Sequence, residues 1–143
     1  MANIPSVASR QLYPGESLLC NDSDLVLVAG SFEVADDADV TNVRGSGFQV
    51  NQGGAEGQWI ITFANPYPQL VAAVPGFIDT DAANDDVAVT FETYNATAGT
   101  MVIKASKENT GVLTPDDTNL DGTRISFVCV FHRKSSLSVT RTS

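Results

Sequence analysis

The sequence predicts an all-β fold, a single antiparallel β-sandwich of jelly-roll or immunoglobulin-like type with extended N- and C-terminal arms. Bulky apolar residues recur at every second position in short runs, clusters of Gly, Pro, Asn and Asp separate these runs, and no window of a dozen residues keeps a helical stripe. Because no helices are available to cross over between parallel strands, the strands should pair antiparallel, as a two-sheet sandwich or a small closed barrel. We favour the sandwich.

Two runs show the alternation most clearly, at 57–63 and 87–94. Successive side chains of a strand point to opposite faces, so residues two apart share a face. The side chains expected to face the core are Trp59, Ile61, Phe63, Val87, Val89 and Phe91. In the second run Thr90 and Glu92 should point outward, which is typical of an antiparallel sheet with one wet face.

Further strands are predicted at 25–28, 48–50, 70–74, 101–104 and 124–131. The last strand is apolar on both faces, because Val128 and Val130 alternate with a second apolar set that includes Cys129. We therefore place it centrally in a sheet or beneath a partner, with Cys129 buried as a free thiol. Segment 105–123 carries no strand signal and is expected to be a long loop.

Turns are predicted where glycines cluster, at 45–47 and at 53–54. Both 45–47 and 53–54 lack a following helix that could hold a phosphate, so they indicate hairpin turns.

A chain of 143 residues predicts one domain. We divide it into an N-terminal arm (1–12), the β-sandwich (13–132) and a basic C-terminal tail (133–143). Fraying, docking on a partner, and an edge strand at 137–140 are open alternatives for these ends.

Charge is divided unevenly along the chain. Positions 1–121 carry 17 acids and 4 bases, whereas positions 122–143 carry 4 bases and no acid. Such a split indicates which surfaces meet solvent and which meet a partner. The net charge of −9 repels nucleic acid and anionic lipid, so neither is expected as a partner. The sequence shows neither a secretory signal nor an apolar stretch of the roughly 18 residues that a membrane span needs.

One loop resembles half of a calcium site. Asp117, Asn119 and Asp121 alternate and are followed by Gly122, but Val128 stands where a closing Glu should be. A carboxylate-rich turn explains these residues equally well. We expect no metal and no cofactor.

No residues point to catalysis. The acids cluster on turns, where water keeps them all ionised, and the sole histidine, His132, has no Gly-x-Ser-x-Gly nucleophile to serve. We expect the protein not to be an enzyme.

Four segments, at 57–63, 65–70, 99–104 and 124–136, resemble the small virion structural proteins of tailed bacteriophages, in particular head decoration, or cement, proteins. The likeness covers roughly residues 45–136 and lies in the order of strands and turns. It implies a non-enzymatic β-sandwich that is made in the host bacterial cytoplasm and is carried on the virion. Such a protein binds the outer surface of the assembled capsid and stabilises the head.

The partner implied is the major capsid protein, with other copies of the chain as a homo-oligomer. We expect the contacts to come from both ends of the chain, through Arg10, Tyr13, Arg133, Lys134 and Arg141. The alternative is a phage surface or tail adhesin module that binds host glycans. Exposed aromatic side chains near Trp59, Tyr67 and Tyr94 would favour it.

Overall fold

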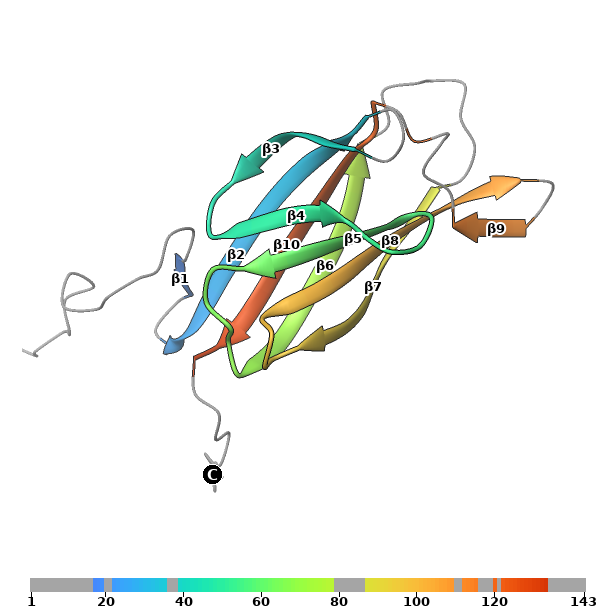
Figure 1. The fold of residues 1–143 in the computed structure, drawn as a ribbon. Helices are drawn as coiled ribbons and strands as arrows, with labels where there is room; N and C mark the ends of the chain where they lie inside the picture. Colours follow the sequence, from blue (N-terminus) through green and yellow to red (C-terminus); the bar gives the residue numbers. More distant parts are fainter. Residues whose placement is uncertain are drawn as a thin grey trace, which may run out of the picture.

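The computed structural model describes residues 17–19, 22–35, 39–78, 87–109, 112–115, 120 and 122–133. These residues form ten strands in two five-stranded antiparallel sheets that pack face to face (Figure 1). The predicted antiparallel β-sandwich is confirmed. The two terminal segments that were expected to form arms lie largely outside the described residues.

Sheet A consists of β1 (Ser17–Leu19), β2 (Asp22–Val34), β3 (Val40–Gly45), β6 (Gln69–Ile78) and β10 (Arg124–His132). Its order is β1-β2-β10-β6, and β3 also pairs with β2. β1 pairs with the first half of the long strand β2 and β3 pairs with the second half, so they lie end to end along one edge. β10 lies between β2 and β6, which confirms its predicted central position.

Sheet B consists of β4 (Phe48–Gln52), β5 (Gln58–Phe63), β7 (Val87–Asn95), β8 (Thr100–Asn109) and β9 (Val112–Pro115). Its order is β4-β5-β8-β7, and β9 pairs with the last residues of β8. Among the described strands, β6 and β7 therefore form the edges on one side of the sandwich, and β4 forms an edge on the other.

The core lies between the sheets and is rich in aromatic rings. Trp59, Ile61 and Phe63 of β5 are buried, as predicted from their spacing. Phe131 of β10 stacks on Tyr67 at 4.5 Å and meets Phe63 edge to face at 4.7 Å. Ring pairs at such distances add about 0.5–1.5 kcal/mol each beyond their buried area.

Three expectations need correction. Segment 105–123 is not a continuous loop, because β8 runs on to Asn109 and β9 follows it. Strand β3 has no counterpart in the prediction, since all but its first residue are exposed and its sequence carries no alternation. The glycines at 45–47 do not close a hairpin but carry the chain from sheet A to sheet B.

Gly45 shows why glycine is needed at this crossing. Its φ is 108°, and a β-carbon there would lie 2.6 Å from the carbonyl oxygen of Ala29. The second predicted turn is a hairpin as expected. It joins β4 to β5, and the amide of Gly53 donates to the carbonyl of Gln58 at 2.7 Å.

Candidate interaction surface

Exposed large hydrophobic side chains gather on one part of sheet A. Of the six found among the described residues, one is Val43 of β3, and the other five lie on the neighbouring strands β6 and β10. These five are Val71, Val74, Phe77, Ile78 and Val128. Phe77 lies opposite the buried Ile125 and therefore points to the inner side of the sheet, whereas Val74 and Val128 lie opposite each other on the outer side. Contiguous exposed apolar side chains usually mark a surface that another molecule covers.

The register of β10 shows which of these residues point away from the core. Ile125, Phe127, Cys129 and Phe131 are buried, so the residues between them form the outer face of sheet A. Val128 lies directly opposite Val74 on this outer face, and Val130 lies opposite Ala72. Val74 is 63% exposed and Val128 is 39% exposed.

The apolar surface continues across β10 onto β2. Val128 is paired with Ala29 on that side and Val130 with Leu27. We call this surface the apolar face; its members are Leu27, Ala29, Ala72, Val74, Val128 and Val130. None of them is charged or polar, and they span three adjacent strands.

A polar cluster bounds one end of the apolar face. Arg124, at the start of β10, donates to Ser31 Oγ at 3.0 Å, to the Asn42 carbonyl at 3.1 Å and to Glu33 Oε2 at 3.3 Å. Asn42 Nδ2 also donates to Glu33 Oε2, at 2.9 Å. These bonds fix the guanidinium against the sheet instead of leaving it free to reach across the apolar face.

The outer face of sheet B is different in character. Thr62 lies opposite Thr100 on β8 and opposite Gln49 on β4, and all three side chains are polar. Lys104 approaches Glu92 at 3.8 Å, and Gln58 Nε2 donates to the same carboxylate oxygen at 3.3 Å. Ile60 of β5 and Val102 of β8 are also paired on this face, and both are half-buried. The outer face of sheet B is therefore mixed, but all the exposed large hydrophobic side chains among the described residues lie on sheet A.

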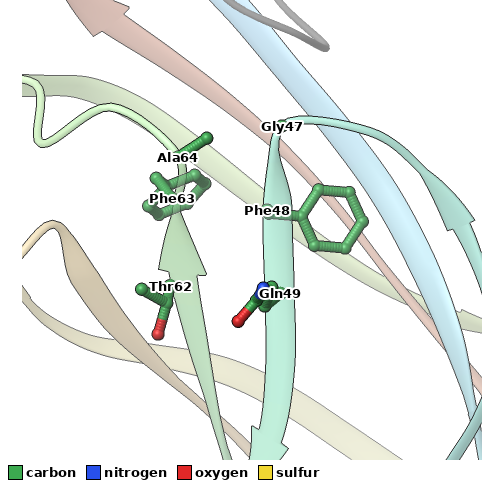
Figure 2. Close-up of a pocket in the computed structure, with 6 residues that line it drawn as sticks. All are labelled: Gly47, Phe48, Gln49, Thr62, Phe63 and Ala64. Carbon is green, nitrogen blue, oxygen red and sulfur yellow. The ribbon is translucent and has the colours of Figure 1, made fainter.

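A shallow pocket of about 340 Å³ lies where β4 begins and β5 ends (Figure 2). It is lined by Gly47, Phe48, Gln49, Thr62, Phe63 and Ala64. Figure 2 shows Gln49 and Thr62 side by side on the two strands, whereas the ring of Phe48 points away from β5. No titratable side chain lines the pocket, so it offers binding contacts and no acid or base for catalysis.

Of the residues predicted to contact a partner, the structure describes only Arg133. Its amide donates to the Asp24 carbonyl at 2.8 Å, and its side chain is half-buried at the end of β10. The other predicted contacts, and the candidate calcium ligands, lie outside the described residues. They are Arg10, Tyr13, Lys134, Arg141, Asp117, Asn119 and Asp121. Within the described residues, no three His, Cys, Asp or Glu side chains are grouped so as to hold a metal ion.

The aromatic residues that would have favoured a glycan site are not available on the surface. Trp59 is fully buried and Tyr67 is 2% exposed. Tyr94 is half-buried, and its hydroxyl donates to the Tyr67 carbonyl at 2.7 Å. Their rings pack in or against the core, so the exposed aromatic side chains that would favour the glycan-binding alternative are not found at these three residues.

Cys129 is buried, as predicted. Burial raises the pKa of its thiol to about 12, so the reactive thiolate is disfavoured at neutral pH. Among the described residues Cys129 is a free cysteine. Its place between Phe127 and Phe131 in the core makes it a packing residue.

In the part of the chain that the structure describes, no helix has the length and apolar character to cross a membrane. Comparisons of the chain with protein-family models, with curated proteins and with solved structures find no match.

Proposed function

We propose that the protein is a capsid decoration protein of a tailed bacteriophage, which binds the outer surface of the assembled head and stabilises it. The observation that supports this proposal best is the contrast between the two outer faces of the sandwich. Val74 and Val128 project from an apolar face on sheet A, whereas the described residues of sheet B include no exposed large hydrophobic side chain and present threonine, glutamine and a lysine–glutamate pair around the half-buried Ile60 and Val102. A protein whose exposed large hydrophobic side chains lie on one of its two sheets is suited to bind another molecule through that sheet.

The mechanism would be binding by surface burial. A decoration protein that binds the assembled lattice better than free subunits shifts the equilibrium toward the assembled shell. Many copies, each with a modest interface, then strengthen the head together. The apolar face would meet the major capsid protein, and sheet B would face solvent.

The basic C-terminal tail would add to this contact. Arg133 stands at the end of β10, the strand that carries Val128 and Val130. The tail therefore leaves the sandwich from a strand of the apolar face. Under this proposal Lys134 and Arg141, with Arg10 and Tyr13 of the N-terminal arm, contact the capsid protein next to the apolar face.

The test is binding to DNA-emptied heads of the phage that carries this chain. We expect the protein to cosediment with the heads and to raise their melting temperature. Val74→Lys combined with Val128→Lys should abolish both effects, because two buried unpaired charges would oppose docking. Thr90→Lys, which adds a charge to an exposed position of β7 in sheet B, is the matched control and should bind normally.

Heads that bind no protein and gain no thermal stability would contradict the proposal. If the double variant bound as well as the unsubstituted protein while folding normally, the apolar face would not be the contact.

A further inference from the structure

One strand of sheet B has an open edge. The amide of Ala64 donates to the Gly47 carbonyl at 2.9 Å, and the amide of Gly53 donates to the Gln58 carbonyl at 2.7 Å. Hydrogen-bonded and non-hydrogen-bonded pairs alternate along an antiparallel ladder. Counting inward from these two bonds, the backbone N–H and C=O groups of Phe48 and Val50 point away from β5, toward the free edge of β4.

The other long edge strands carry devices that oppose the addition of a further strand. The hydrogen bond from the amide of Arg133 to the Asp24 carbonyl fixes which residues of β10 bond to β2 and which bond to β6. Counted from this bond, Pro75 of β6 has its nitrogen at the free edge of the strand, where proline offers no donor. β7 has a register shift between Phe91 and Tyr94, and β3 pairs with β2 through another. Bulges and edge prolines are common protections against unwanted strand pairing.

β4 has none of these protections. Its five residues pair with β5 in an unbroken register and include neither proline nor charge. Phe48 and Val50 pack against the core, while Gln49 and Asn51 lie exposed on the outer face. The pocket shown in Figure 2 lies at the beginning of this strand. That pocket is lined by residues of both β4 and β5, so the free edge of β4 is separate from it. A free backbone edge is what a sheet needs to accept an extended peptide as an added strand.

The C-terminal tail carries a segment of matching pattern. In residues 136–140, Leu137 and Val139 alternate with serine and threonine, and there is no charge. As a strand beside β4, this segment would place its two apolar side chains next to Phe48 and Val50. Its hydroxyl side chains would lie next to Gln49 and Asn51 on the outer face.

The C-terminal tail is too short to reach the free edge of β4 in its own molecule. It leaves the sandwich at Arg133, which is hydrogen-bonded to Asp24 at the start of β2. The ring of Phe48 lies over Gly30, six residues further along β2, which corresponds to about 20 Å at about 3.3 Å per residue. Leu137 is four residues beyond Arg133 and reaches at most about 14 Å even when fully extended.

We therefore propose that β4 accepts residues 136–140 of a neighbouring copy as an added strand. The contact is head-to-tail, so each copy offers one edge and one tail. Such contacts close into a ring where the rotation between copies allows it and otherwise continue as an open array. The inference goes beyond capsid binding and is tested without a capsid.

The experiment uses the full-length chain and two complementary variants, studied by analytical ultracentrifugation over a concentration series. Val50→Pro removes a donor at the free edge of β4 without removing a bond to β5. Leu137→Asp combined with Val139→Asp blocks the tail and leaves all described strands unchanged. We expect the unsubstituted protein to self-associate, each variant alone to be monomeric, and an equimolar mixture of the two to form heterodimers, because each supplies what the other lacks.

Val89→Pro is the matched control, since the same alternation places its N–H at the free edge of β7. It should self-associate like the unsubstituted protein. A monomeric unsubstituted protein would overturn the proposal, as would a mixture that stays monomeric. If the tail variant still dimerised while Val50→Pro did not, β4 would be pairing with a second β4 and the assignment to the tail would be wrong. Head binding by the monomeric variants is measured separately, so failure of this proposal is distinguishable from failure of the capsid proposal.

Discussion

The ring of Phe48 lies directly on Gly30, and a β-carbon at Gly30 would come within 2.1 Å of Phe48 Cζ. The two residues belong to different sheets, and their contact closes the sandwich on the side where β3 and β4 are the edges. On its inner side, the Phe48 ring meets Phe127 edge to face at 4.8 Å. The absence of a side chain at position 30 is thus part of the packing of sheet B on sheet A.

Gly30→Ala should therefore destabilise the fold. The methyl group must displace the Phe48 ring, and overpacking of this kind costs about 1–3 kcal/mol. Gly54→Ala is the matched control, because a β-carbon there meets nothing within 4 Å. It should be neutral or slightly stabilising. Urea unfolding of the two variants checks the difference, and equal midpoints would contradict the packing role of Gly30.

Stability should fall at alkaline pH. Burial raises the pKa of the Cys129 thiol from 9.0 to about 12. The pKa of Tyr94 is raised from 10.0 to about 12, mainly by burial and to a smaller extent by the nearby charge of an ionised Cys129. The folded protein thus holds both protons more tightly than the unfolded chain does. The stability that these two groups contribute to the folded state is fully present below pH 9 and is lost as the pH rises from about 9 to about 12.

For Cys129 the slope should approach about 1.4 kcal/mol per pH unit within this window. Urea unfolding at pH 7, 8, 9 and 10 measures it. Cys129→Ala should flatten the decline between pH 9 and pH 10, whatever it costs at pH 7. A variant whose stability falls as steeply as that of the unsubstituted protein would show that other groups control the alkaline loss.

Tyr94→Phe should cost about 1 kcal/mol, since it removes the hydrogen bond of the hydroxyl to the Tyr67 carbonyl and leaves that acceptor without its donor. The ring contacts with Phe63 at 6.1 Å and Phe131 at 5.2 Å should remain. Tyr94→Leu, which also removes the ring, is the comparison and should be clearly less stable. Thermal unfolding of both variants separates the hydroxyl from the ring, and a phenylalanine variant as unstable as the leucine one would count against this division.

Whether a strand could be predicted from the sequence depended on whether one of its faces is buried. β5 and β10 were predictable because one face of each is buried, and the sequence therefore alternates, as at Trp59 and Ile61. β3 was not predictable, because it is held to β2 by backbone bonds while side chains such as Val43 stay exposed. Strands without a buried face leave no periodic pattern in the sequence.

The candidate surface was predictable only in part. The continuous apolar character of β10 already indicated a central strand or one covered by a partner, and β6 carries the same signal around Val74. The register between β6 and β10 decides which residues of β6 face outward. This register shifts between Val130 and Phe131, so Val71 is not paired with any residue of β10. A one-residue shift of this kind reverses the faces of a strand, so sequence alone could not assign them. The open edge of β4 depends likewise on strand order.

The apolar face should contribute to association and little to stability. Val74→Thr combined with Val128→Thr replaces two exposed methyl groups by hydroxyls of the same shape, and water can hydrogen-bond both hydroxyls. We expect the free energy of unfolding to change by no more than about 0.5 kcal/mol per site. Val28→Thr is the control, because Val28 is 1% exposed and packs in the core. There the buried hydroxyl should cost about 1–3 kcal/mol. Urea unfolding measures stability, and retention on a phenyl matrix measures exposed apolar surface. The exposed pair should elute earlier at unchanged stability; if it instead lost as much stability as Val28→Thr, its two valines would belong to the core, and the apolar face would not be free to bind a partner.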